Sequence, residues 1–158
     1  MLPSASRYAA ALAVLRIYTG ISWLIHGYGK ITNPAWAAPN GMFVGILQDM
    51  TKDTSGAYHD FVTGVVIPHF ATFAMLVAWG ETLTGVALTL GLLTRLGGAG
   101  GAFLALNYWL SKAGYANLNG YAGLDMAAIA LSAINLALPT GLVAGIDGLI
   151  AARKRPAG

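Results

Sequence analysis

Cysteine is absent from this chain of 158 residues, and charged residues make up only 9% of it. The lack of cysteine excludes disulfide bonds, thiolate metal sites and iron–sulfur clusters. A soluble domain carries about 25% charged residues, so a small domain with this composition could not cover a surface exposed to water. Hydrophobic residues make up 56% of the chain, and the mean hydropathy is +0.63. The composition therefore predicts a membrane protein, for which lipid is the solvent.

Several functional motifs are missing as well. There is no phosphate-binding loop, nucleophile elbow or HExxH zinc motif. His59, His69 and Asp60 could make a metal site, but three ligands of unknown geometry are weak grounds for one. The three histidines include no pair placed for haem ligation. We expect no metal and no haem, and the few charges, with a net value of +3, exclude nucleic acid as a partner.

Four apolar segments are long enough, or nearly so, to cross a membrane as helices. They cover residues 8–30, 67–93, 96–111 and 121–143. A spanning helix needs about 20 residues, and about 17 are tolerated. The chain is therefore predicted to be all-α, a single domain over 1–158 that forms an integral membrane four-helix bundle.

The basic residues near the ends of these segments predict the orientation. Arg7, Arg95 and the basic tail within 144–158 fall on one side, and Lys30, Lys52 and Lys112 fall on the other. Because lysine and arginine concentrate in cytoplasmic loops, both termini are placed in the cytoplasm of a prokaryotic inner membrane. The segment 31–66 is then a long extracytoplasmic connection, with a short helix expected around Phe43–Met50.

The first helix contains the stretch LRIYTGISWLIHGYGK, residues 15–30, whose polar residues form a stripe. At about 100° per residue, Arg16, Trp23, His26 and Lys30 fall within roughly an 80° arc. An unpaired charge inside a membrane costs at least about 2.5–3.5 kcal/mol. From their estimated depths we expect Arg16 to form an ion pair with Glu81 of the second helix. That pair could be a structural link between helices or part of the chemistry.

A second polar layer lies nearer the outer membrane surface. It comprises Trp23, His26, Lys30, Asn107, Lys112 and Asp125. Such a pocket suits a quinone head group, whose two carbonyls take up protons as electrons arrive; His26 and Asp125 are the candidate proton-handling, catalytic residues. Trp23, Lys30, Asn107 and Lys112 are the candidate quinone-binding residues. The alternative is ordinary anchoring, since lysine, tyrosine and tryptophan gather at membrane surfaces.

Two blocks of the sequence resemble the DoxX/DoxD family. In the first, an R-x-x-x-G core followed by H-G-x-x-K is matched by Arg16, Gly20, His26, Gly27 and Lys30. The second is WGETLTGVALTLGLLTR, residues 79–95, in which an acidic residue, a glycine and L-G-L-x-T-R match the family pattern. The long segment 31–66 is more similar to the DoxD branch.

This resemblance implies a membrane subunit of a quinone-linked oxidoreductase. Members include the small subunit of thiosulfate:quinone oxidoreductase, which implies that electrons pass from thiosulfate, giving tetrathionate, to quinone. An anionic sulfur donor would then be drawn from outside by Lys30 and Lys112, and quinone would enter from the lipid. The alternative is a non-catalytic accessory subunit of a larger respiratory or photosynthetic complex. The partners expected are membrane lipid, quinone, and other membrane subunits or further copies of this chain.

Overall fold

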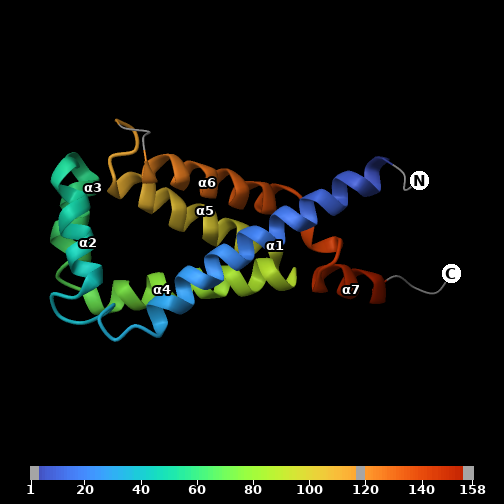
Figure 1. Ribbon diagram of the computed structural model, residues 1–158, viewed down its shortest axis with the longest axis horizontal. Coiled ribbons are helices and arrows are strands. Elements are labelled where there is room, and N and C mark those ends of the chain that lie inside the picture. Colours follow the sequence, from blue (N-terminus) through green and yellow to red (C-terminus); the bar gives the residue numbers. More distant parts are fainter. Residues whose placement is uncertain (1–3, 117–119, 155–158) are drawn as a thin grey trace.

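The computed structural model describes residues 4–116 and 120–154, and within these residues all regular structure is helical. The predicted all-α class is thus confirmed. Four long helices make up most of the molecule (Figure 1): α1 (Ser4–Ile31), α4 (Phe70–Leu90), α5 (Thr94–Ser111) and α6 (Tyr121–Ala137).

The four long helices contact one another in a closed order. α1 packs on α4, α4 on α5, α5 on α6, and α6 returns to α1. The contact between α6 and α1 is the least extensive of the four, and the contacts of α1 with α4 and of α5 with α6 are the most extensive. α1 crosses over the other three, and its N-terminal part projects beyond them (Figure 1).

Glycines set the register between α1 and α4. A Cβ added to Gly20 would lie 2.4 Å from the backbone nitrogen of Thr89. A Cβ added to Gly27 would lie 2.4 Å from the backbone nitrogen of Thr82. Both positions require glycine because the two backbones approach too closely for any side chain. Residues of α1 therefore run antiparallel along α4, with Gly27 one turn from Lys30 and opposite the residue after Glu81.

The ends of the long helices differ somewhat from the predicted bounds. The second predicted helix, 67–93, corresponds to α4, which ends before Gly91, a glycine with φ of +66°. Only glycine adopts this left-handed conformation without strain, which makes it a frequent helix terminator. The fourth, 121–143, corresponds to α6, which ends at Ala137. Pro139 follows two residues later and cannot continue a helix.

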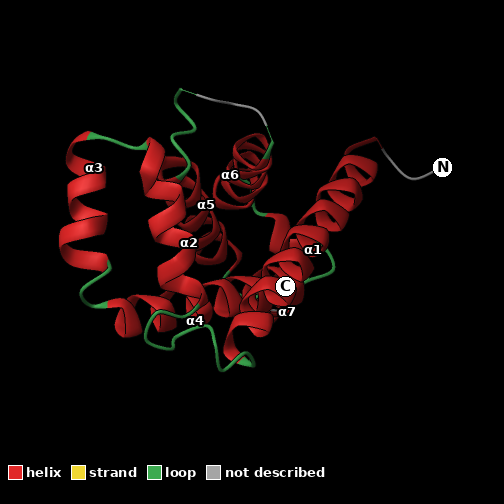
Figure 2. Ribbon diagram, turned by 60° about the vertical axis from the view of Figure 1, so that its left-hand side comes forward, coloured by secondary structure: helices red, strands yellow, loops and turns green. Residues whose placement is uncertain are grey.

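The segment 31–66 folds across the ends of the long helices (Figures 1 and 2). It contains α2 (Met42–Met50), a 3₁₀ turn (Thr51–Asp53), α3 (Gly56–Phe61) and a π-helical turn (Val62–Val66). Trp36 and Phe43 are buried with Val62 and with two alanines of α4. The indole of Trp36 donates a hydrogen bond of 2.9 Å to the carbonyl of Ala74. The segment is therefore packed onto α4 instead of extending into solvent.

At the opposite end, a 3₁₀ turn (Thr140–Leu142) and α7 (Ile146–Arg153) fold back against the turn between α4 and α5. The carboxylate of Asp147 accepts hydrogen bonds from the backbone nitrogens of Leu93 and Thr94 and from the Thr94 hydroxyl, at 2.8, 3.0 and 2.7 Å. Burial raises the pKa of Asp147, but these hydrogen bonds and the charge of Arg16 outweigh it and hold the pKa below its usual range.

Two of the described helices are long and apolar enough to cross a membrane, α1 over Arg7–Ile31 and α4. α6 is apolar but has 17 residues, and α5 has 18. Large apolar side chains are exposed along the outer faces of all four, among them Ile25, Leu83, Phe103 and Leu124.

Candidate functional site

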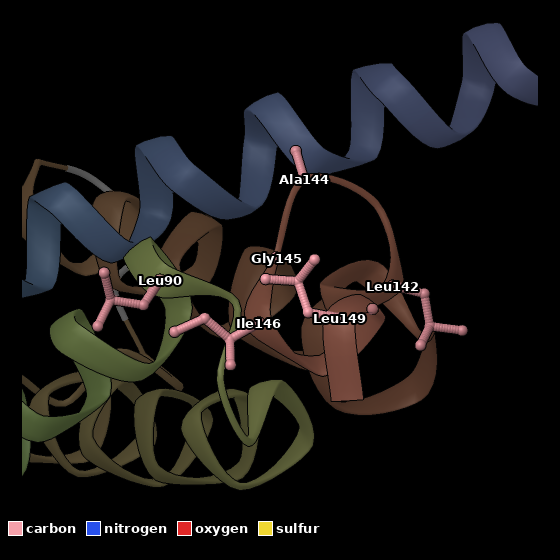
Figure 3. Close-up of a pocket in the computed structure, with 7 residues that line it drawn as sticks. Leu90, Leu142, Ala144, Gly145, Ile146 and Leu149 are labelled. Atoms are coloured by element: carbon pink, nitrogen blue, oxygen red, sulfur yellow. The ribbon is translucent and has the colours of Figure 1, made fainter. Parts of the chain in front are cut away.

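Among the cavities lined by the described residues, two are of similar size. One, of about 540 Å³, lies between the end of α4 and α7, and Figure 3 shows its lining. Its walls carry no ionisable side chain; they are formed by Leu90, Leu142, Ala144, Gly145, Ile146, Gly148 and Leu149. The other, of about 510 Å³, is lined by α1, α2, α4, α5 and α6 and contains both ionisable and apolar side chains. We call the second the central cavity, and it holds the candidate site.

Glu81 is the buried centre of the polar side of the central cavity. Its side chain is 1% exposed, and one carboxylate oxygen lies 2.5 Å from Nζ of Lys30. The other oxygen accepts a short hydrogen bond from the hydroxyl of Tyr108. Three helices thus contribute one group each, α1 the lysine, α4 the carboxylate and α5 the tyrosine. The two partners compensate the cost of burying the carboxylate.

A second ion pair belongs to the lining of the same cavity. Nζ of Lys112 lies 2.6 Å from a carboxylate oxygen of Asp125, and both side chains are largely buried. The ring of Tyr108 lies near both lysines, with Nζ of Lys30 at 5.6 Å and Nζ of Lys112 at 5.5 Å from its centroid. These distances allow cation–π attraction, so that Tyr108 links both pairs.

His26 and Trp23 continue the lining along α1. Nδ1 of His26 lies 2.7 Å from the carbonyl oxygen of Ser22, so it donates, and Nε2 is left to bind another group. Trp23 is buried, stacks on Tyr108 with 6.4 Å between ring centroids, and donates a hydrogen bond of 3.3 Å to the hydroxyl of Ser132.

The structure thus brings together five of the six residues predicted for the outer layer, namely Trp23, His26, Lys30, Lys112 and Asp125. The sixth, Asn107, is outside the cavity lining. Its side-chain amide donates to the carbonyl of Phe103, and its own backbone carbonyl accepts from Tyr58 of α3. Asn107 lies one residue before Tyr108 on α5, so the helical rotation turns it to a different face.

The predicted ion pair between Arg16 and Glu81 is wrong. Arg16 is fully buried near the middle of α1, beside the C-terminal end of α4, where its guanidinium donates to the carbonyls of Leu88 at 2.6 Å and Ala144 at 2.8 Å. The glycine contacts explain this, because their register places Arg16 opposite the end of α4. Leu88 lies two turns, about 10 Å, from Glu81 along that helix. Arg16 instead donates hydrogen bonds to carbonyls at the C-terminal end of α4, where its positive charge is attracted by the negative end of the helix dipole.

The charges of the central cavity cancel. The two lysines and the two carboxylates sum to zero when all four are ionised, and each lysine is within 2.6 Å of a carboxylate. An anionic donor drawn to Lys30 or Lys112 would have to compete with a carboxylate already in contact. The lysines therefore do not form the anion-attracting pair that their positions in the sequence suggest.

Two central residues were assigned differently from sequence. Glu81 was expected to pair with Arg16, and Tyr108 was not among the candidate site residues. The spacing of Tyr108 and Lys112, four residues apart on one helical face, is the signal that could have placed both in the pocket. For Trp36, the sequence indicated only an apolar residue within the segment 31–66, and not a place in the cavity lining. Nζ of Lys30 lies 5.1 Å from its ring centroid.

Among the described residues, no group of three or more histidine, aspartate and glutamate side chains is placed to hold a metal ion. The site instead has hydrogen-bonding groups at one end of a mostly apolar cavity, a common form for sites that bind small organic molecules.

These observations define a class of protein: an all-helical protein with long apolar helices and, between them, a mostly apolar cavity that contains a cluster of polar side chains. The model of the DoxX family matches residues 11–114, and the chain belongs to the DoxX family. DoxX proteins are generally membrane proteins, and the resemblance drawn from the two sequence blocks is confirmed. The match includes Lys30, Glu81, Tyr108 and Lys112 and ends before Asp125. No curated protein and no solved structure matched the chain in the comparisons made.

Proposed function

We propose that the chain is a multi-pass membrane protein with both termini in the cytoplasm. The N-terminal part of α1 and the helix α7 lie at the same end of the molecule (Figure 1), and Arg7, Arg95 and Arg153 are exposed. This distribution agrees with the positive-inside rule. The helices α5 and α6 are short, but about 17 residues are enough to span. The apolar side chains exposed on all four long helices would contact lipid.

In this arrangement, the central cavity binds a quinone. The observation that carries this proposal is the cluster of Lys30, Glu81 and Tyr108 at one end of a cavity with otherwise largely apolar walls. A quinone has the same division, with two carbonyl oxygens on a flat ring and an apolar tail. The volume of about 510 Å³ is in the range of about 300–1,000 Å³ found for small-molecule sites.

The residues of the cavity can also handle the protons of quinone chemistry. Reduction of a quinone to a quinol takes two electrons and two protons. His26 lines the cavity with Nε2 not used by Ser22, and when the ring is protonated Nε2 can donate one proton to a carbonyl oxygen. Asp125, when protonated, is the candidate donor at the second oxygen. If thiosulfate is the reductant, two thiosulfate ions lose one electron each and join through a new sulfur–sulfur bond as tetrathionate.

The second candidate function is that of an accessory subunit without catalysis. It is favoured by the observation that every lysine and carboxylate of the cavity is already paired within the chain. In this function, the pairs serve only to hold α1, α4, α5 and α6 together and take no part in chemistry. In that case, the exposed apolar faces would pack against subunits of a larger respiratory or photosynthetic complex.

Binding of quinone to the protein in lipid nanodiscs tests the first candidate. Tryptophan fluorescence is a suitable signal, because Trp23 and Trp36 line the cavity. We expect saturable quenching by quinone, weakened about tenfold by His26→Ala, equivalent to about 1.4 kcal/mol. His69→Ala is the matched control, since His69 is also exposed and its Nδ1 also contacts a backbone carbonyl four residues earlier. Equal affinities in both variants would reject the role of His26, and no saturable binding by the wild type would reject the quinone site.

A further inference from the structure

The central cavity is elongated along the interface between α1 and α6. α1 lines it from Tyr18 to Lys30, a length of about 18 Å, and α6 lines it from Tyr121 to Leu131, about 15 Å. The two lysines, the two carboxylates and His26 lie toward the end near Lys30, and the other end, near Tyr18 and Leu131, has no charged side chain. The cavity therefore has a polar end and a predominantly apolar end.

We call the interface between two neighbouring long helices a seam. The seam between α1 and α6 is the least extensive of the four. The seams on either side are closed by backbone contacts. A Cβ on Gly27 would lie 2.4 Å from α4, and one on Gly98 would lie 2.4 Å from the backbone nitrogen of Leu136 in α6. Along the open seam, Tyr18 and Leu124 are both exposed and both line the cavity. The opening thus lies on the side of the molecule, at the surface that would contact lipid.

The polar end suits an uncharged head group. Its two ion pairs leave no net charge, and Tyr108 and His26 provide neutral hydrogen-bonding groups beside them. A charged ligand would lose its hydration without gaining a free counter-ion. A carbonyl or hydroxyl group loses far less.

We propose that the central cavity admits a tailed, uncharged amphiphile sideways between α1 and α6. Its head group lies beside Glu81 and Tyr108, and its tail leaves along Ala128 and Leu131 toward the lipid. This inference rests on the proposed quinone function and adds the route of entry and the positions of the head group and the tail. It also predicts that an anionic sulfur donor does not bind in this cavity, because both of its lysines are already paired with carboxylates.

The test compares two probes, an isoprenoid-tailed benzoquinone and the same ring without the tail, in nanodiscs. Ala128→Phe places a large side chain where the tail leaves, at a distance from the charged groups. Ala130→Phe is the matched control, since Ala130 lies on the same helix, is exposed and does not line the cavity. We expect Ala128→Phe to weaken binding of the tailed quinone about tenfold and to change binding of the tailless ring less than about twofold. Ala130→Phe should change neither.

The outcomes separate the two proposals. If neither quinone binds the wild type, the quinone function fails, and this inference fails with it. If both bind but Ala128→Phe weakens both equally, or neither, the route between α1 and α6 is wrong while the quinone function stands. If Ala128→Phe does not fold, Leu124→Trp makes the same test from the rim, where Leu124 is 65% exposed.

A third titration tests the uncharged head group. Thiosulfate is added to the protein with bound tailed quinone, at an ionic strength held constant with chloride. We expect no displacement of the quinone. Displacement by thiosulfate, and not by chloride, would overturn the assignment of the cavity to an uncharged head group.

Discussion

Removal of one partner of the Lys30–Glu81 pair should destabilise the protein much more than removal of both. The carboxylate is 1% exposed and the lysine side chain 18% exposed, so neither charge can recover its hydration when the other is lost. Loss of one member of a buried pair costs about 3–5 kcal/mol, mostly because the remaining charge is left uncompensated. We therefore expect Lys30→Met and Glu81→Gln each to lower the free energy of unfolding by an amount in this range.

The double variant Lys30→Met/Glu81→Gln should lose less than the sum of the two single variants. It leaves no uncompensated charge, and the amide of the introduced glutamine can still accept the hydrogen bond from Tyr108. The coupling energy from the double-mutant cycle should be at least about 1 kcal/mol. The free energies of unfolding can be measured by denaturant titration in one fixed detergent.

A second cycle, with Arg16→Met and Glu81→Gln, serves as the control. Arg16 bonds to carbonyls about two turns from Glu81, so these two changes should add to within about 0.5 kcal/mol. The account of the site would be refuted if Lys30 and Glu81 were additive. It would also be refuted if Arg16 and Glu81 were the coupled pair.

Two other features give predictions of stability. Gly27→Ala should lower the free energy of unfolding by about 1–3 kcal/mol, because its Cβ would meet the backbone of α4 at 2.4 Å. Gly29→Ala, whose Cβ would have nothing within 4 Å, should be neutral or stabilising by up to about 1 kcal/mol. Similar melting temperatures of the two variants would contradict the register of α1 on α4. Asp147→Ala should cost about 1–2 kcal/mol near pH 7, because the carboxylate caps the start of α5. The pKa of Asp147 is lowered in the folded state, so its stabilisation is complete above the unfolded value of about 3.9 and is lost as the pH falls through the folded pKa. The difference between wild type and Asp147→Ala should therefore narrow in acid, and a difference that stayed constant from pH 7 to pH 3 would exclude this cap.

Much of the fold could be predicted from the sequence because each feature depends on residues close together in the chain. Apolar length marks the long helices, and helical period places His26 and Lys30 on one face of α1. The family motif is likewise carried by short blocks. The predicted ends of two helices were less accurate, because the helix-terminating effect of Gly91 and Pro139 was underestimated. α4 ends directly before Gly91, and α6 ends two residues before Pro139.

The pairing of charges could not be predicted because it depends on how two helices lie against each other. Depth estimates from the membrane boundary placed Arg16 near Glu81, but an error of two turns is enough to change the partner. That register is determined by the close contacts of Gly20 and Gly27 with α4, which apolar patterning does not reveal. Tyr108 has the same difficulty, because a tyrosine near a membrane surface is usually an anchor and only the packing of three helices shows it bonded to a buried carboxylate.

The most direct measurement of the central claim is the amount of quinone that leaves the membrane with the protein. The chain is extracted with its surrounding lipid in polymer nanodiscs, and quinone per chain is quantified by mass spectrometry for the wild type and for Ala128→Phe. The account predicts about one quinone per wild-type chain above the level in bulk lipid, and a loss of that excess in the variant. Quinone at the level of bulk lipid in both samples would contradict it.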